Sequence, residues 1–399
     1  MLEELKDKKI LILGFGREGQ DAFLFLKRLF PKKIIGIADA KKVSAKNAVL
    51  HTGKNYLKAI KKYDVVVKSP GIPFKILPKS SIKKIITPTD IFFDNCPSKI
   101  IGVTGTKGKS TTSSFIYQTL KSGGVKAKLI GNIGKPVLMS LLGAKKEDVF
   151  VYELSSHQLF HLKKSPHIAV LLNIYKEHLD YYKSFSEYAR AKANIAKYQT
   201  KKDYFIYNSS DKRVKQIAKA SKVKKIPIQG KYYDLNKAAA QAIAKLFKIK
   251  PLKSFKLLPH RLELVGTFQG IEFYNDSLST IPETTIEALD FLGSKVETLI
   301  LGGFDRGLSF KKLGQRISKS QVRNVILFPK TGQRINKEIK NKNINHFFAR
   351  NMKEAVKQAY QNTKQNKICL LSPASPSFGL FKDYQERGEL FKKYVKMLK

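Results

Sequence analysis

The chain of 399 residues is poor in cysteine, poor in acidic residues and free of long hydrophobic runs. Its two cysteines, Cys96 and Cys369, are too few for a disulfide scaffold or a cysteine-rich zinc module. The opening stretch MLEELKDKK has no apolar segment of the signal-peptide kind, and apolar runs such as 168–174 are too short to span a membrane. We therefore expect a cytoplasmic protein that does not insert into membranes.

Acidic residues are scarce, since 31 Asp and Glu face 76 Lys and Arg, a formal net charge of +45. Such a surplus is typical of proteins that bind nucleic acid or anionic membranes. The basic residues are spread along the chain, although 98–256 holds 32 of them against 9 acidic ones. No zinc-finger spacing and no aromatic RNA-binding signature accompanies them. We expect a lysine-rich surface and polyanionic small ligands, and we keep a basic nucleic-acid binder as the distant alternative.

Strand-like and helix-like segments alternate along the chain, which predicts an α/β fold with mostly parallel sheets. The apolar share of 42% is sufficient for folding, and the length suits two or three domains. Residues 94–98 (DNCPS) resemble a linker, and the pattern breaks again between 251 and 259. We expect three α/β domains, at residues 1–97, 98–256 and 257–399.

Apolar runs and helical spacing predict the individual elements. Strands are expected at 8–13, before Asp39, and at 63–73, 99–105, 148–155, 167–174, 296–303, 324–329 and 366–373. Helices are expected at 20–30, 110–122, 186–198, 235–247 and 351–360. Residues 262–276 alternate as a hairpin that turns at Gln269-Gly270.

A glycine turn, Gly14-Phe15-Gly16-Arg17-Glu18-Gly19, follows the first expected strand and precedes a helix. Glycines at this spacing let the backbone approach a diphosphate at the helix N-terminus, and Asp39 could accept hydrogen bonds from a ribose. On its own the motif suits a dinucleotide-dependent oxidoreductase, a nucleotide site of another kind, or a plain tight turn. Nothing later in the chain supplies a hydride-transfer site, so a nucleotide fits better than NAD.

The segment GVTGTKGKST (102–111) lies between a strand and a helix, where free N–H groups and the helix dipole favour phosphate. Lys109 would reach the β- and γ-phosphates, and Ser110 or Thr111 could hold Mg²⁺. The spacing departs from the usual P-loop, because Val103 stands five positions before Gly108. A Gly/Thr-rich turn that binds no nucleotide is the alternative.

Glu153 ends an apolar strand, where an unpaired carboxylate would be costly unless it binds a metal ion. A surface glutamate at a strand end is the alternative. His178 and Lys192 give no functional signal by themselves. The other histidines show no metal-ligand pairing, so zinc is not expected.

Five motifs occur in order: GVTGTKGKST, YELSSHQL, LLNIYKEHLDYY with ARAK, LPHRLELVG with NDS, and LSPASPSFGLFKDYQERG. Together they resemble the Mur ligase family over nearly the whole chain, and most closely its D-glutamate-adding members. The resemblance implies an N-terminal Rossmann-like domain for the UDP-sugar, a central P-loop ATPase domain and a C-terminal Rossmann-like domain for the amino acid.

The resemblance also implies the chemistry. A monomeric, ATP-dependent ligase would use two Mg²⁺ ions to add glutamate to UDP-N-acetylmuramoyl-L-alanine through an acyl phosphate, in peptidoglycan synthesis. Its catalytic residues would be Lys109, His178 and Lys192, and Lys192 matches a lysine that the family carbamylates.

Binding residues follow from the same motif matches. ATP would contact Gly105, Thr106, Lys107, Gly108, Lys109, Ser110, Thr111, Asn236, Arg261 and Asp276. The UDP-sugar would contact Gly14, Phe15, Gly16, Arg17, Asp39, Ser69, Pro70, Gly71 and Asn132. Metal ligands would be Ser110, Thr111, Glu153, His178 and carbamylated Lys192, and glutamate would contact Thr280, Arg306, Ser377, Phe378 and Tyr384.

The sequence departs from the family pattern near the amino-acid side. After Asn275-Asp276-Ser277 the pattern usually continues with lysine, where this chain has Leu278, and Arg306 stands where a lysine often meets the glutamate side chain. Arginine keeps the charge but offers a bidentate fork. These changes leave open an L-glutamate-adding ligase, another Mur-type amide ligase such as the L-alanine-adding one, or folylpolyglutamate synthetase, although the glycine turn and LSPASPSF argue against the folate enzyme.

Overall fold

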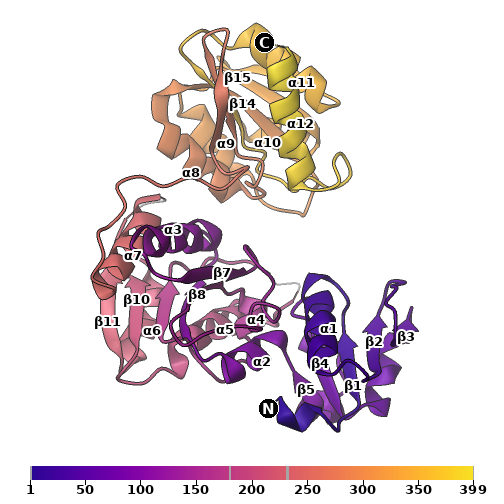
Figure 1. The fold of residues 1–399 in the computed structure, drawn as a ribbon. Helices are drawn as coiled ribbons and strands as arrows, with labels where there is room; N and C mark the ends of the chain where they lie inside the picture. Colours follow the sequence, from indigo (N-terminus) through magenta and orange to yellow (C-terminus); the bar gives the residue numbers. More distant parts are fainter. Residues whose placement is uncertain (1, 179–180, 231–232, 399) are drawn as a thin grey trace. The chain divides into compact units, whose positions relative to one another are not determined.

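The structure is a computed structural model that describes residues 2–178, 181–230 and 233–398. The chain divides into two compact units, Met1–Phe255 (unit 1) and Lys256–Lys399 (unit 2). The strands of the described residues form three sheets, two in unit 1 and one in unit 2 (Figure 1). No helix within these residues is long and apolar enough to cross a membrane.

The first sheet is parallel, with the order β3-β2-β1-β4-β5. Alternate side chains of β1 enter different cores, because successive residues of a strand face opposite sides. Ile10 and Ile12 pack with α1, whereas Leu11 and Leu13 pack with the 3₁₀ helix η2. The elements are β1 (Ile10–Leu13), α1 (Arg17–Leu29), β2 (Ile35–Asp39), β3 (Ala48–Thr52), η2 (Tyr56–Lys62), β4 (Val65–Lys68), β5 (Ile85–Ile86) and α2 (Pro88–Asn95), with short 3₁₀ turns at Glu3–Leu5, Phe74–Ile76 and Lys79–Lys84.

The second sheet is also parallel, with the order β11-β10-β9-β6-β8-β7. Helices α3 and α7 lie on one face, and α4 and α5 lie on the other (Figure 1). The elements are β6 (Lys99–Thr104), α3 (Lys109–Ser122), β7 (Ala127–Gly131), β8 (Val149–Glu153), α4 (Ser156–Leu159), β9 (Ile168–Leu171), α5 (Phe185–Lys197), β10 (Tyr204–Asn208), α6 (Lys212–Ala220), β11 (Lys224–Ile228) and α7 (Tyr233–Leu246).

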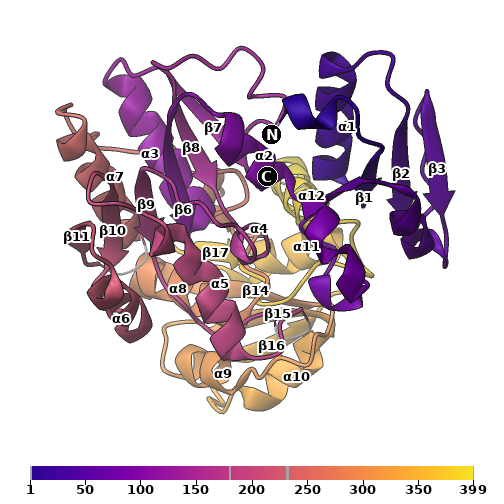
Figure 2. The same ribbon diagram turned by 90° about the horizontal axis from the view of Figure 1, so that it is seen from below.

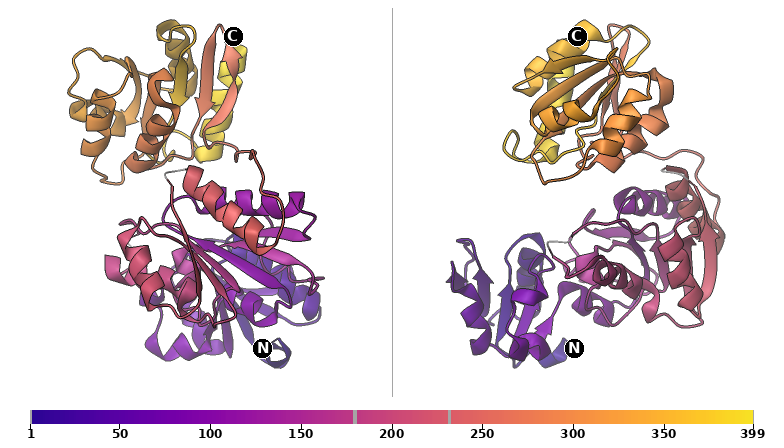
Figure 3. Two further views of the ribbon diagram at one scale, coloured as in Figure 1. Left: turned by 90° about the vertical axis from the view of Figure 1, so that its left-hand side faces the viewer. Right: turned by 180° about the vertical axis from the view of Figure 1, so that it is seen from behind.

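The sheet of unit 2 has the order β12-β13-β17-β14-β15-β16 and is parallel except for the β12–β13 hairpin. Figure 2 shows β17, β14, β15 and β16 in this order. Helices α11 and α12 cover one face, and α8, α9 and α10 cover the other (Figure 3). The elements are β12 (Glu263–Phe268), β13 (Ile271–Asn275), α8 (Pro282–Leu292), η5 (Gly293–Lys295), β14 (Val296–Gly303), α9 (Lys311–Ser318), β15 (Asn324–Lys330), α10 (Thr331–Glu338), β16 (Asn345–Phe348), α11 (Met352–Asn362), β17 (Ile368–Leu371) and α12 (Tyr384–Met397).

The α/β fold with mostly parallel sheets and the hairpin at Gln269-Gly270 are confirmed. The expected linker at 94–98 is wrong in part, because α2 continues to Asn95. A capping box between Thr87 and Asp90, with Pro88 in the first turn, stabilises the N-terminus of that helix. The limits of the three expected domains stay a prediction.

Candidate active site

The loop between β6 and α3 follows the end of a central strand, as the phosphate motif predicts. Gly108 has φ 82° and caps α3, and a Cβ atom there would lie 2.8 Å from Asn236 Oδ1. Thr112 Oγ1 donates a 2.8 Å hydrogen bond to that same Asn236 oxygen. The turn therefore requires glycine, and α7 places Asn236 beside it.

Asn173, which follows β9, holds the loop in shape. Its Oδ1 accepts from the Lys107 N–H at 2.8 Å, and its Nδ2 donates to the Lys107 carbonyl at 3.2 Å. Its own carbonyl accepts from the Thr106 N–H at 2.8 Å. We did not predict Asn173, although it lies inside the quoted motif LLNIYKEHLDYY.

Two lysines from different elements meet at the carbonyl oxygen of Gly105. Lys109 Nζ donates to it at 3.0 Å and to the Thr106 carbonyl at 2.9 Å, and Lys192 Nζ donates to it at 2.8 Å. Lys192 comes from α5 and is 1% exposed. Burial, and next the charge of Lys109, lower the pKa of Lys192 well below its ordinary value. The structure thus brings together two of the three predicted catalytic residues.

Two buried oxygens beside the loop fit a metal ion. Thr111 Oγ1 and Glu153 Oε2 are buried and have no hydrogen-bond partner within the described part of the chain. Glu153, the last residue of β8, pairs with Val103 of β6, which places it beside the end of the strand that precedes the loop. A carboxylate and a hydroxyl are ligands that Mg²⁺ accepts. The donor set therefore fits Mg²⁺, and Ser110, half-buried, is the neighbour of Thr111.

His178 lies in the loop after β9, next to Glu177. Its φ of 58° is in the left-handed region, its side chain is 42% exposed, and its Nε2 is 3.7 Å from Glu177 Oε2. Lys107 Nζ is 2.9 Å from Glu177 Oε1. Burial favours the protonated carboxyl of Glu177, but the combined effect of Lys107, His178 and Lys109 lowers its pKa. An ion pair thus ties the predicted His178 loop to the phosphate loop.

The glycine turn after β1 joins the carboxyl ends of three strands. Ser69 Oγ donates to the Gly14 carbonyl at 2.7 Å, and the Phe15 N–H donates to Asp39 Oδ2 at 2.7 Å. A Cβ on Gly19 would lie 2.0 Å from the Gly14 carbonyl oxygen, so this position requires glycine. Asp39 thus orders the turn itself, and its predicted contact with a ribose stays a prediction.

Other predicted UDP-sugar residues contact the second sheet's loops. Arg17 donates to the carbonyls of Asn132 at 3.1 Å and Gly134 at 2.7 Å, and the Pro70 carbonyl accepts from Tyr181 Oη at 3.1 Å. Gly16 and Gly71 have open space where a Cβ would stand. These contacts bring Arg17 and Pro70 of the first sheet's edge to the segments at 132–134 and Tyr181 in the same unit.

A buried charge cluster that we did not predict lies under the glycine turn. Lys68 is fully buried and donates to the carbonyls of Ser69 at 2.9 Å and Ile72 at 2.8 Å. Glu18 Oε1 accepts from Gln158 at 2.9 Å, while its Oε2 is buried without a partner among the described residues. Burial, and then the charge of Asp21, raise the pKa of Glu18 to about 7, and burial lowers the pKa of Lys68 to about 8.

In unit 2, a buried network holds Asp276. Its carboxylate accepts from Ser279 Oγ, from Ser372 Oγ at 2.8 Å and from the Leu262 N–H at 3.2 Å. Burial raises its pKa to about 6, although these bonds and Arg261 oppose the rise. Arg261 and Asp276, both predicted to contact ATP, are therefore neighbours.

Arg387 joins two of the quoted motifs, and we did not predict it. It is fully buried and donates to Ser277 Oγ at 3.0 Å, to the Ser277 carbonyl at 2.8 Å and to the Ser375 carbonyl at 3.0 Å. Burial lowers its pKa to about 9. The NDS and LSPASPSF segments are thus fixed to each other through one side chain.

The five residues predicted to hold glutamate lie in two groups. The Arg306 guanidinium carbon is 5.8 Å from the centre of the Phe378 ring, and Ser377 is the buried neighbour of Phe378. The Tyr384 carbonyl accepts from Ser277 Oγ at 2.8 Å, and Thr280 follows Ser277 closely in the chain. The structure brings the first group together beside the Phe378 ring.

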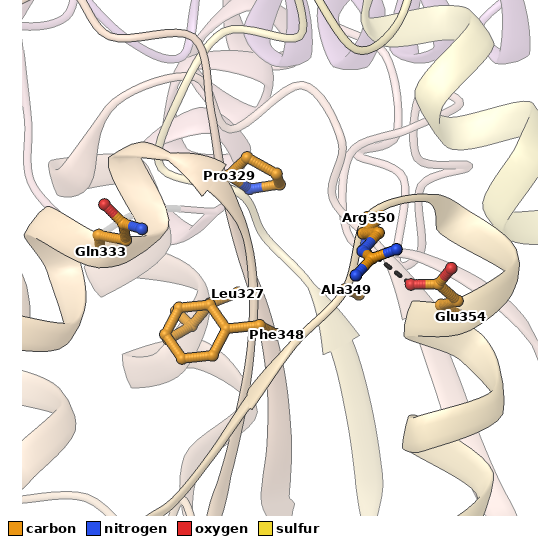
Figure 4. Close-up of a pocket in the computed structure, with 7 residues that line it drawn as sticks. All are labelled: Leu327, Pro329, Gln333, Phe348, Ala349, Arg350 and Glu354. Carbon is orange, nitrogen blue, oxygen red and sulfur yellow. Dashed lines mark hydrogen bonds between the residues drawn. The ribbon is translucent and has the colours of Figure 1, made fainter.

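A cavity of about 480 Å³ lies at the carboxyl ends of β15 and β16 (Figure 4). It is lined by Leu327, Pro329, Gln333, Phe348, Ala349, Arg350 and Glu354. None of the predicted glutamate residues is among them.

Comparisons with known proteins agree with this geometry. The Mur ligase middle domain matches residues 103–270, and the Mur ligase glutamate ligase domain matches residues 260–375. UDP-N-acetylmuramoylalanine–D-glutamate ligase of Acetivibrio thermocellus is 31% identical, over 98% of this chain and 97% of that protein. The enzyme of that name from Ligilactobacillus salivarius is also 31% identical, over 100% and 98%.

Solved structures share the fold at low identity. MurF ligase from Thermotoga maritima, in complex with ADP, has a TM-score of 0.64 and 17% identity, over 100% of this chain and 97% of that one. A pseudomurein peptide ligase type C from Methanothermus fervidus has a TM-score of 0.61 and 16% identity, over 98% and 100%. With a relative at 31% identity over almost its full length, the chain belongs to the Mur ligase family.

Proposed function

We propose that this chain is a cytoplasmic, monomeric, ATP-dependent ligase that joins D-glutamate to UDP-N-acetylmuramoyl-L-alanine in peptidoglycan synthesis. The full-length similarity to D-glutamate ligases carries the proposal. The phosphate loop supports it, because Lys109 and Lys192 meet at Gly105 and Glu153 lies at the end of the same strand pair.

The loop residues stabilise the transferred phosphoryl group. The N-terminus of α3 directs its positive dipole end at the phosphates, and Lys109 exchanges its carbonyl partners for phosphate oxygens. An oxygen of the alanyl carboxylate attacks the γ-phosphorus and ADP leaves, which gives an acyl phosphate. The glutamate amine then attacks the acyl carbon, loses a proton, and inorganic phosphate leaves as the amide forms. Such chemistry depends on positioned charge.

Thr111 and Glu153, with Ser110, His178 and a carbamylated Lys192, would hold two Mg²⁺ ions. The orphaned buried oxygens of Thr111 and Glu153 support this part of the proposal. When bound, the ions would neutralise charge on the phosphates. The chain itself holds these ligands on α3, β8, α5 and the loop after β9.

The other predicted residues bind the three substrates. Asn236, Arg261 and Asp276 bind ATP, and the turn at 14–17 with Asp39, the 69–71 loop and Asn132 bind the UDP-sugar. Arg306, Ser377, Phe378, Thr280 and Tyr384 bind glutamate. These assignments agree with the neighbours that Ser69, Asp39 and Arg17 have in unit 1.

The test is phosphate release from ATP with UDP-N-acetylmuramoyl-L-alanine as acceptor, with D-glutamate, L-glutamate and L-alanine compared in parallel. Release with D-glutamate alone is expected. Release only with L-glutamate would assign the chain to an L-glutamate-adding ligase, for which Leu278 and Arg306 are the residues to examine. No release with any amino acid would overturn the proposal. Gel filtration tests the proposed monomeric state separately.

A further inference from the structure

Two cations and two aromatic rings gather beside the end of β14. The Arg306 guanidinium carbon is 5.8 Å from the Phe378 ring centre, and Lys330 Nζ is 5.6 Å from the Phe304 ring centre. The two rings are 6.3 Å apart, edge to face. A Cβ built on Gly379 would lie 3.6 Å from Lys330 Nζ. Lys330 therefore reaches the same loop that carries Phe378.

The backbone at Lys330 is strained in a way that serves this arrangement. Its φ of 67° and ψ of −93° are near a rare kind of γ-turn. Such conformations are costly and persist only where the surroundings enforce them. Thr331 enforces this one, because its hydroxyl accepts from the Gly303 N–H at 2.8 Å and from Ser375 Oγ at 2.9 Å and donates to the Gly303 carbonyl at 3.0 Å.

The positive charges in this cluster have no carboxylate partner among the described residues. The nearest candidate in sequence, Asp305, accepts from Arg334 at 2.5 Å and from the Gly307 N–H at 2.8 Å. Arg306 and Lys330 are both exposed, as are the two rings. Two unpaired cations on a rigid frame suit a small molecule with two negative groups.

We propose that Lys330 is a second cation of the glutamate site, which binds the α-carboxylate while Arg306 binds the side-chain carboxylate. The inference rests on the proposed function. It supplies the charge that Leu278, an aliphatic residue, cannot provide on the amino-acid side. Lys330 acts as a substrate-binding residue and takes no part in proton or phosphoryl transfer.

The experiment compares Lys330→Met, Lys330→Arg and the matched control Lys337→Met, which removes an exposed charge from α10. We expect Lys330→Met to raise the KM for glutamate about 10- to 100-fold, the worth of one charged hydrogen bond, with unchanged KM values for ATP and the UDP-sugar. Lys330→Arg restores most of the loss, and Lys337→Met matches the wild type. Thermal unfolding confirms that each variant is folded.

Two amides of glutamate, the α-amide and the side-chain amide, show which carboxylate Lys330 binds. The wild type discriminates against both the α-amide and the side-chain amide, and Lys330→Met loses discrimination against the α-amide only. A wild-type glutamate KM in Lys330→Met, or lost discrimination against the side-chain amide instead, overturns the inference. Absence of glutamate-dependent phosphate release in the wild type is a separate result, which overturns the proposed function.

Discussion

Replacement of Glu18 by glutamine tests the buried charge cluster under the glycine turn. Burial and the neighbouring Asp21 raise the pKa of Glu18 from 4.5 to about 7, against the opposing effects of Gln158, Lys68 and Arg17. The folded protein therefore holds this proton more tightly than the unfolded chain does. Stability must decrease as the pH rises between 4.5 and about 7, and remain low above that range.

The magnitude follows from the size of the shift. At about 1.4 kcal/mol for each pKa unit, the ionised carboxylate lowers the free energy of unfolding by up to about 3 kcal/mol above pH 7. Glutamine cannot ionise, and its oxygen can still accept from Gln158. Glu18→Gln should therefore be more stable than the wild type above pH 7, by up to about 3 kcal/mol, and the difference should vanish near pH 4.5.

Urea unfolding followed by far-UV circular dichroism measures this difference across the pH range. Glu147→Gln, an exposed carboxamide substitution in the same unit, is the control and should follow the wild-type profile. Parallel pH profiles for Glu18→Gln and the wild type would refute the reasoning. So would a variant that is less stable at pH 8, because the carboxylate would then contribute a net favourable interaction with Lys68.

Three further predictions concern the loops. Lys109→Met should lower kcat about 10²- to 10³-fold in phosphate release, because a positioned charge on the transferred group is lost, whereas the exposed Lys121→Met on the same helix should not. Glu153→Gln should raise the Mg²⁺ concentration for half-maximal activity about tenfold or more, and an unchanged metal titration would exclude Glu153 as a ligand. Gly19→Ala places a Cβ 2.0 Å from a carbonyl oxygen, so it should destabilise unit 1 by about 1–3 kcal/mol and raise the KM for the UDP-sugar, which calorimetry and initial rates measure. Gly71→Ala, where space is open, should leave the calorimetric stability unchanged.

Sequence reasoning succeeded where the signal is local. The phosphate loop, its helix and the strand before it are contiguous, so glycine spacing and an apolar run are enough to place Lys109 and Ser110. It failed where one side chain bonds to a distant segment. Arg387 contacts Ser277 across 110 residues of sequence, and Glu18 contacts Gln158 across 140. The hydrophobic periodicity of a sequence carries no information on such distant pairs. Asp39 is an intermediate case, because its place at a strand end was predictable while its bond to the Phe15 N–H was not.

Two buried lysines lie at the loops that we assign to polyanions, apart from the lysine-rich surface. Within the part of the chain that the structure describes, Lys68 and Lys192 are the buried ones, and both donate to carbonyl oxygens of loops that we assign to polyanions, Ser69 and Ile72 for one and Gly105 for the other. At physiological ionic strength, salt screens the interaction of exposed charges beyond about 8 Å, but it screens buried charges far less. Rising salt should therefore slow the encounter with ATP, which the lysine-rich surface attracts, while the dissociation rate of ATP changes little. Stopped-flow binding separates the two rates, and a dissociation rate that climbs steeply with salt would mean that surface lysines, rather than the phosphate loop with Lys109, retain the nucleotide.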